Sequence, residues 1–437
     1  MSDPLNTNTL GQSNGKSGKN RFNFGPAILV TAAFIGPGTV MTASKAGAQY
    51  GFTLLWAILF SVITAIVLQE MAARLGIVSK AGLAFAIQST FSNPWTKWPA
   101  VLLVLGAILF GNCAYQTGNI LGAATGMELL TGFGKFGWSI AISLIAVAVI
   151  MFGRFAIIQN LLTALVALMG VLFVFCAILC GPELSAMVEG LKPSIPAGSE
   201  WVIIGLIGTT VVPYNLFLHA SAAASKYSDE GKSKKNVGLD DESSTLAAVR
   251  HSLVDTVIAI FVGGVITSAL LITAAVAFRE AELAGPADIA KQLRPGLGAW
   301  AEWVFAIGLF AAGLTSSITA PIAAAFATAG CFGWEPKLSN VRLQVTAVSV
   351  VAIGLTCALL FGSSPTEAII VAQVANGLLL PIVAVFLIYV LNRKQLLGRF
   401  TNGWFGNILG VVVVLATILM AARQFHSVWN KLLAMWQ

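Results

Sequence analysis

The sequence is poor in charged residues. Only 10% of its 437 residues are Asp, Glu, Lys or Arg, whereas 57% are hydrophobic. A soluble globular domain carries about 25% charged residues, so the composition argues against one. The apolar residues gather in runs of about 18 or more, the length that crosses a bilayer as a helix. Backbone groups inside a bilayer have no water to bind, and a helix satisfies them within one run. The sequence therefore predicts an all-α integral membrane protein.

Two further absences narrow the possibilities. The five cysteines form no Cys-x-x-Cys pair, so the spacing of a metal–thiolate site is missing and we expect no cofactor. Residues 1–24 lack the apolar stretch of a signal peptide, and their polar composition predicts a disordered cytosolic tail. The formal net charge of +7 is explained by basic cytoplasmic loops, and we expect no nucleic-acid partner.

The apolar runs predict eleven spans within one transmembrane domain, residues 25–427. The spans are 25–49, 53–75, 98–127, 137–153, 156–180, 200–224, 252–278, 297–330, 343–361, 366–391 and 404–422. Five spans form a first repeat, about 25–180, five form a second, about 200–391, and 404–422 is an extra helix. The segment 225–251 is expected to be a solvated cytosolic loop with a short helix.

Basic residues predict the orientation of the chain. Most of the 25 Lys and Arg residues fall on the same side as the N-terminus. Cytoplasmic loops carry such an excess, which predicts a cytoplasmic N-terminus and an external C-terminus. We expect a multi-pass protein of the plasma membrane, of a bacterial inner membrane in particular.

Two spans carry helix-breaking residues in their middles. Gly36-Pro37-Gly38-Thr39 interrupts the first span, and Pro213 interrupts the sixth. Proline removes a backbone donor, and glycine tolerates an unwound conformation. Unwound backbone at membrane depth survives only where it is buried in protein or lines a cavity. Matching breaks at the start of two repeats predict an inverted-repeat transporter that works by alternating access, with its site at the breaks.

Five segments of the spans carry a specific pattern: AGAQYGFTLLWAILF, LQEMAARLGIVS, GTTVVPYNLFLHAS, FAIGLFAAGLTSSIT and QVANGLLLPIVAVFLIYVLNR. Together they resemble the Nramp (natural resistance-associated macrophage protein) family of proton-coupled divalent-metal transporters. The resemblance runs through nearly all of the spans. It implies a LeuT-type fold of five plus five helices, with helices 1 and 6 broken, and it implies metal ion transport rather than enzymatic activity.

The residues that carry this function in the family are replaced here. The resemblance implies a metal site from Asp-Pro-Gly-Asn, Met-Pro-His and a Gln before Leu-Pro. Those positions hold Gly36-Pro37-Gly38-Thr39, Val212-Pro213-Tyr214 and Leu379. Gln116 and Asn119 stand where the family has the Asp and Glu of its proton route, while His219 is retained. The usual metal site and proton route are therefore expected to be lost, since divalent ions usually need a charged ligand.

Neutral polar residues remain as candidates for a substrate site. The predicted substrate site consists of Gly36, Pro37, Gly38, Thr39, Thr209, Val212, Tyr214, Asn215, Asn376 and Leu379. A possible side route consists of Gln116, Asn119, His219 and Lys45. Each side-route residue has an alternative role: the two amides in hydrogen bonds between helices, His219 as a packed remnant, and Lys45 as a side chain reaching the outer interface.

These residues favour a transporter with altered substrate and coupling. One alternative is a cation carrier that binds a partly hydrated ion such as Mg²⁺ through carbonyl and amide oxygens. Another is a carrier of a small zwitterionic or anionic organic solute, because half-helix N-termini favour anionic groups. A third is a relative that no longer transports. The expected partners are a small solute or ion and the lipid bilayer, and no protein partner is inferred.

Overall fold

The structure is almost entirely helical. It is a computed structural model that describes residues 35–91, 93–152, 155–233, 242–278, 286–334 and 340–435. No strand occurs among these residues, which confirms the all-α fold class. The predicted tail and the first half of the first predicted span lie outside the described residues.

Each half of the chain supplies one set of long helices. The first set is α2 (Pro37–Tyr50), α3 (Leu55–Ser79), α5 (Pro94–Thr131), α6 (Lys135–Phe152) and α7 (Phe155–Leu179). The second set is α9 (Glu200–Thr210) with α10 (Pro213–Ser233), then α11 (Glu242–Ala277), α14 (Ala301–Phe332), α15 (Val341–Phe361) and α16 (Pro365–Leu391). The long α18 (Trp404–Met435) follows both sets. Each predicted span overlaps one of these helices where the structure describes it, except that the sixth, 200–224, is divided between α9 and α10.

Short helices connect the long ones. They are α4 (Leu83–Thr90), α8 (Leu184–Glu189), α12 (Pro286–Ala290), η1 (Lys291–Leu293), α13 (Arg294–Leu297), η2 (Gly298–Trp300), α17 (Lys394–Leu397) and η3 (Gly398–Phe400). Within the described residues, eight helices are long and apolar enough to cross a membrane, or nine if the bent pair Lys394–Phe400 and Trp404–Leu419 is one span. The predicted number of eleven spans stays a prediction.

The predicted loop 225–251 is more helical than expected. α10 continues to Ser233 and α11 already begins at Glu242, so both ends of the segment extend long helices. Its residues include Ala, Lys, Ser and Glu, which tolerate or favour a helix outside the apolar layer. The fall in hydropathy shows where the apolar runs on either side of 225–251 end. It does not show where helices α10 and α11 end, because both continue into the polar segment.

The two sets pack against each other reciprocally. α2 packs on α11, and α3 packs on α9 and α10. The first member of each set therefore packs on the second member of the other set. The third members, α5 and α14, pack directly together. Both exchanged contacts use a glycine: a Cβ on Gly47 would overlap the carbonyl of Leu271, and one on Gly76 would overlap that of Ala220. Small residues let membrane helices approach closely, and the reciprocity is that of an inverted repeat.

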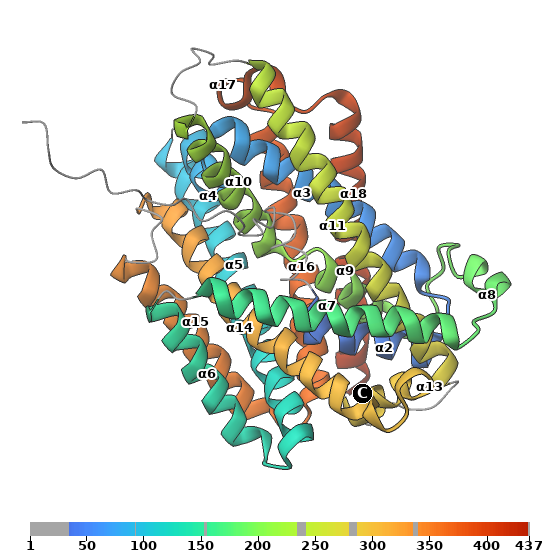
Figure 1. The fold of residues 1–437 in the computed structure, drawn as a ribbon. Helices are drawn as coiled ribbons and strands as arrows, with labels where there is room; N and C mark the ends of the chain where they lie inside the picture. Colours follow the sequence, from blue (N-terminus) through green and yellow to red (C-terminus); the bar gives the residue numbers. More distant parts are fainter. Residues whose placement is uncertain are drawn as a thin grey trace, which may run out of the picture.

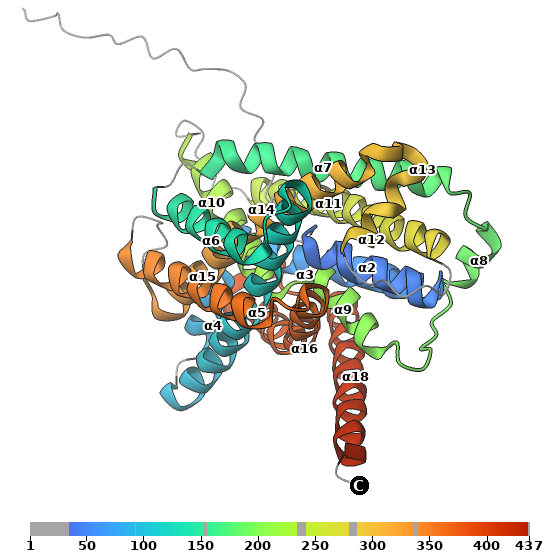
Figure 2. The same cartoon turned by 90° about the horizontal axis from the view of Figure 1, so that it is seen from below.

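The remaining helices surround this centre. α7 lies across α11 and α14, and the short α8 stands at the edge of the molecule (Figure 1). α6 and α15 lie side by side at one end, whereas α18 packs on α16 and projects from the lower side in Figure 2. α16 contacts α2, α5 and α9, which places it beside both helices that carry the breaks.

Candidate functional site

The first break lies at the start of α2. Gly36 is the N-cap residue, with φ −111° and ψ −177°, and no side chain caps the helix. The Gly36 carbonyl accepts the amides of Thr39 and Val40 at 3.1 and 3.3 Å, which starts the first turn. Pro37 follows at a position where proline suits a helix, because its missing N–H would have no acceptor there. Its ring packs on Gly122 of α5, where a Cβ would overlap it.

The second break separates α9 from α10. α9 ends at Thr210, and Val211 leaves the helix with φ −108° and ψ 73°. The Val212 carbonyl accepts the amide of Asn215 at 3.0 Å, so a new helix begins at Pro213. The break falls where the proline in the sixth span predicts it, because proline cannot continue the ladder of backbone bonds.

The two breaks meet through a pair of threonines. Thr39 Oγ1 lies 2.8 Å from Thr209 Oγ1, and both side chains are fully buried. The residues are 170 positions apart in the chain and come from the first helix of each set. The structure thus brings together the breaks at the center of the predicted substrate site.

α16 covers the junction of the breaks. The side-chain amide of Gln373 fills the space beside Gly38, where a Cβ would overlap it. Three residues later Asn376 is also buried, and its Oδ1 lies 3.4 Å from the Cβ position of Gly111 in α5. Leu379 reaches the same Gly111, with Cδ1 at 3.0 Å from that position. Gln373 belongs with the predicted residues, although it was not among them.

α5 and α14 approach the first break from the other side. An ideal Cβ on Gly36 would lie 3.2 Å from Ser316 Oγ, 3.3 Å from the Tyr115 hydroxyl and 3.9 Å from Asn119 Oδ1. The Tyr115 ring meets the Tyr214 ring edge to face, with centroids 5.4 Å apart. Tyr115 and Ser316 were missed by the sequence reasoning. The polar run Thr-Ser-Ser-Ile-Thr in an apolar span was the available signal for Ser316.

The other side-route residues have partners of their own. Gln116 Nε2 donates to the Ser317 carbonyl at 3.0 Å, which is a hydrogen bond between helices α5 and α14. His219 Nδ1 lies 2.9 Å from Gln69 Oε1, between α10 and α3. Lys45 Nζ pairs with Glu367 at the start of α16, at 2.9 Å. Of the four residues, Asn119 lies beside the first break.

The chemistry of the junction is neutral. Among the described side chains, no Asp, Glu, Lys or Arg is buried, and no group of three His, Cys, Asp or Glu residues is arranged to hold a metal. Several buried polar atoms near the breaks have no hydrogen-bond partner among the described residues. They are Gln373 Oε1, Asn376 Nδ2, Asn119 Nδ2 and both amide atoms of Asn215. Unpaired buried polar groups are costly and mark places where a ligand or water can bind.

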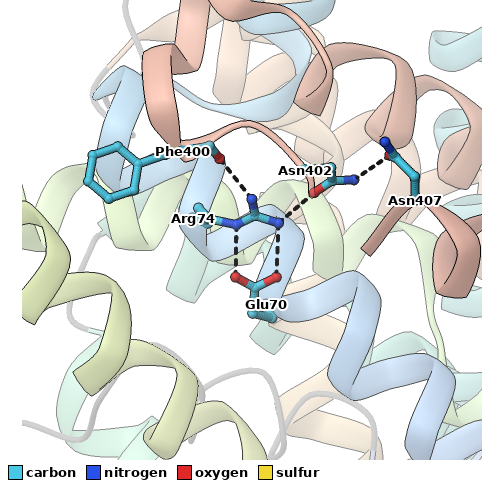
Figure 3. A network of polar contacts seen from close by, with 5 residues as sticks. All are labelled: Glu70, Arg74, Phe400, Asn402 and Asn407. Atoms are coloured by element: carbon cyan, nitrogen blue, oxygen red, sulfur yellow. Dashed lines mark hydrogen bonds and ion pairs between the residues drawn. The ribbon is translucent and has the colours of Figure 1, made fainter. Parts of the chain in front are cut away.

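A second polar region differs in kind. Near the end of α3, Arg74 binds Glu70 through Nε and Nη2 at 2.8 and 3.2 Å. It also donates to the Phe400 carbonyl at 2.7 Å and to Asn402 Oδ1 at 2.6 Å (Figure 3). Asn402 in turn donates to Asn407 in α18. We call these five residues the Arg74 network; it joins α3 to the turn between α16 and α18.

The chain is similar to known transporters over nearly its whole length. The sequence profile of the family described as natural resistance-associated macrophage protein-like, Nramp, matches residues 27–426. The divalent metal cation transporter MntH of Listeria welshimeri is 27% identical over 438 residues, which cover 97% of this chain and 94% of that protein. MntH of a Nostoc species is 29% identical over 422 residues, 94% of this chain and 92% of that protein.

Two solved structures share the fold. A manganese transporter of Eremococcus coleocola superposes with a TM-score of 0.72 at 23% identity, over 91% of this chain and 84% of that chain. MhsT in complex with L-phenylalanine superposes with a TM-score of 0.55 at 18% identity, over 91% and 98%. These likenesses confirm the LeuT-type fold that the broken helices predict. Together with the match of the family profile, they lead to one conclusion: the chain belongs to the Nramp family.

Proposed function

We propose that this protein is a secondary transporter that works by alternating access, with its solute bound at the junction of the two breaks. The contact between Thr39 Oγ1 and Thr209 Oγ1 carries this proposal, because it joins the two helices that carry the predicted breaks. Interrupted helices in corresponding positions of two repeats form the solute sites of such carriers. The Gln373 side chain, whose Oε1 is unpaired, fills the space beside Gly38 at the same junction.

We further propose that the solute is held by hydrogen bonds and is not a dehydrated Mn²⁺ or Fe²⁺ ion. The residues at the family's metal-ligand positions are Gly36, Thr39, Val212 and Leu379, which offer one hydroxyl and backbone groups. Removing water from a divalent ion requires stronger ligands, usually with at least one negative charge. Gln116 and Asn119 cannot take up and release protons, so the usual proton route is lost with the metal site.

The second candidate is a carrier of a hydrated divalent cation such as Mg²⁺. The unpaired Oε1 of Gln373, whose side chain lies beside Gly38, favours it as an oxygen ligand. Mg²⁺ gives up its water reluctantly and can be bound through its hydration shell by neutral oxygens. The curated relatives, named divalent metal cation transporters, also favour a cation.

Uptake by the purified protein in liposomes tests these proposals. We expect saturable uptake of at least one compound from a panel of radiolabelled amino acids and organic acids, and none of Mn²⁺. Thr209→Val should reduce that uptake about fivefold, the value of one hydrogen bond. Thr210→Val is the matched control, because the Thr210 hydroxyl binds the Leu206 carbonyl of its own helix at 3.0 Å.

Each other outcome has a definite meaning. Robust proton-coupled Mn²⁺ uptake would show that hydroxyls and carbonyls replace the missing carboxylate, and the proposed change of solute would be wrong. Uptake of Mg²⁺ that Thr209→Val weakens would select the second candidate. If no solute crosses the membrane, the chain is a relative that does not transport, and the main proposal fails.

The orientation in the membrane is also a proposal. The excess of Lys and Arg on one side supports a cytoplasmic N-terminus and an external C-terminus. This orientation would place the Arg74 network on the cytoplasmic side, because α3 leads from the outer side back to the inner one. Labelling of single cysteines introduced at either end of α3 would check the assignment.

A further inference from the structure

The turn between α16 and α18 carries three basic residues where two apolar helices end. Arg393 directly precedes α17, Lys394 is the first residue of α17, and Arg399 lies in η3. The Arg399 side chain is 55% exposed and Lys394 is also exposed, whereas Leu397 of the same turn is 1% exposed. The turn therefore packs its apolar side on the protein and presents its cations outward.

The turn is held in place from inside the protein. The Phe400 carbonyl and Asn402 Oδ1 accept hydrogen bonds from Arg74, as Figure 3 shows. The helices Lys394–Phe400 and Trp404–Leu419 meet at a bend of 117°, so the short helical turn lies across the end of α18 and does not continue it. Side chains on a fixed turn keep their relative positions, which a binding surface requires.

The positive charge of the turn is only partly balanced. Arg399 forms an ion pair with Glu242 at the start of α11. Among the described residues, no carboxylate pairs with Arg393 or Lys394. The Arg393 guanidinium lies over the Tyr389 ring, 4.2 Å from its centroid, and this contact leaves the N–H groups in the guanidinium plane able to donate. Two cations thus remain for an anionic partner.

The start of α18 continues the basic turn into an apolar stripe. Trp404 and Phe405 are the first residues of α18, and their side chains are 77% and 65% exposed. Exposed apolar side chains then follow Trp404 at helical spacing: Ile408, Val411, Leu415 and Ile418. Tryptophan is enriched where membrane headgroups meet the hydrocarbon layer. Cations, a tryptophan and an apolar stripe therefore follow one another in the order of a lipid headgroup, its interface and its acyl chain.

We infer that Arg393, Lys394, Arg399 and Trp404, which we call the α17 surface, bind the headgroup of an anionic phospholipid. The two unbalanced cations contact the phosphate, and the acyl chains lie along the stripe of α18. Basic sites between membrane helices bind such headgroups. A zwitterionic lipid carries a cationic group beside its phosphate, which the basic turn repels, so the α17 surface favours a lipid with net negative charge. This lipid site goes beyond the proposed function and does not depend on the solute.

Native mass spectrometry of the purified full-length protein tests the lipid site. Dioleoylphosphatidylglycerol and dioleoylphosphatidylcholine have the same acyl chains and differ in the charge of the headgroup. We expect the first phosphatidylglycerol to bind about twentyfold more tightly, because each unbalanced cation near the membrane surface contributes about a factor of five. The difference should shrink as the salt concentration rises. Equal binding of the two lipids would overturn the inference.

Three variants locate the lipid on the α17 surface. Arg393→Gln combined with Lys394→Gln should weaken phosphatidylglycerol binding about twentyfold and leave phosphatidylcholine binding unchanged. Glu242→Gln releases Arg399 from its carboxylate, so it should strengthen phosphatidylglycerol binding about fivefold, a gain that damage to the fold cannot produce. Lys192→Gln is the matched control, because this lysine is 75% exposed and pairs with a carboxylate of its own segment.

A soluble phosphate ester distinguishes a lipid site from a phosphate site. Glycerol 3-phosphate carries the phosphate without acyl chains, and we expect it to leave phosphatidylglycerol bound at equal concentration. If it binds as tightly as the lipid, the turn is a site for soluble phosphate esters and the lipid assignment is wrong. If the double variant and Glu242→Gln both leave phosphatidylglycerol binding unchanged, the lipid binds elsewhere, and the α17 surface has no such role.

Discussion

The junction of the breaks and the Arg74 network are both polar, but their hydrogen bonding is opposite. In the Arg74 network an arginine and a carboxylate carry full charges, and the guanidinium donates four hydrogen bonds, two to Glu70 and one each to Phe400 and Asn402. At the junction the residues are neutral, and buried atoms such as Asn376 Nδ2 have no partner in the described structure. The network is partly exposed, with Arg74 at 13% and Glu70 at 23%, whereas the junction is fully buried.

This difference separates two roles for polar residues in one membrane protein. A satisfied network holds helices together, because each of its members would be left unpaired if another were removed. Unsatisfied groups in a buried place cost stability, and they persist where binding of a ligand or a change of conformation needs them. The Arg74 network therefore has the hydrogen bonding of a structural element, and the junction has the hydrogen bonding that we expect of the proposed solute site.

The largest effect on stability is expected for Arg74→Ala. Removal of the guanidinium leaves Glu70 without its partner, and it leaves the Phe400 carbonyl and Asn402 without their donor. Breaking a buried ion pair from one side costs about 3 to 5 kcal/mol, and partial exposure puts the expected loss near 3 kcal/mol. Thermal unfolding in detergent, with and without a lipid supplement, would measure it.

Arg74→Lys controls for the charge alone. Lysine keeps the positive charge but cannot reproduce the fork that binds Glu70 through two nitrogens, so most of the loss should remain. If Arg74→Ala and Arg74→Lys are both as stable as the wild type, the contacts in Figure 3 contribute nothing to stability. The contrast between the Arg74 network and the junction would then disappear.

A matched pair of substitutions compares the two regions directly. Asn402→Leu removes the acceptor of Arg74 and the donor to Asn407, which should cost about 2 kcal/mol in stability. Asn376→Leu removes an amide whose Nδ2 has no partner, so stability should stay unchanged or rise by about 1 kcal/mol. Solute uptake should respond in the opposite order, falling for Asn376→Leu and persisting for Asn402→Leu.

The comparison would be broken by either of two results. If Asn376→Leu destabilises the protein as much as Asn402→Leu, the Asn376 amide has a structural partner. If it leaves uptake intact, α16 covers the junction without taking part in binding. Thermal unfolding and liposome uptake on the same preparations give both readings.

The fold could be predicted from the sequence to a large extent. Hydrophobic runs located the long helices that the structure describes, and Pro37 and Pro213 stand where α2 and α10 begin, because proline acts on its own backbone wherever it stands. Thr39 and Thr209 were both among the residues of the predicted substrate site, whereas their direct contact was not predicted. The ends of α10 and α11 were not predictable from hydropathy, since helices continue beyond the apolar layer.

The site could be predicted only in part. Residues next to a break, such as Asn215, were identified because their helix was. Tyr115 and Ser316 depend on how α5 and α14 are rotated toward Gly36, and uniformly apolar helices give little periodicity from which to read a rotation. The same limit applied to Gln116 and Asn119, which were both assigned to the possible side route. In the structure Gln116 binds the Ser317 carbonyl, whereas Asn119 lies beside Gly36.

The smallest effect on stability is expected at the ion pair between Lys45 and Glu367. This pair tests whether a charged side chain of α2 influences the otherwise neutral junction. The Glu367 side chain is 64% exposed, and exposed pairs contribute about 0 to 1 kcal/mol because water and salt screen them. Glu367→Gln should therefore lower stability by no more than about 0.5 kcal/mol, and less at high salt.

If the pair only fastens α2 to α16, uptake by Glu367→Gln and by Lys45→Met should match the wild type. If the Lys45 charge acts on the solute, Lys45→Met would instead weaken uptake of the anionic compounds several-fold and spare their amides. That result would move Lys45 from the periphery of α2 into the site, and the junction would no longer be neutral.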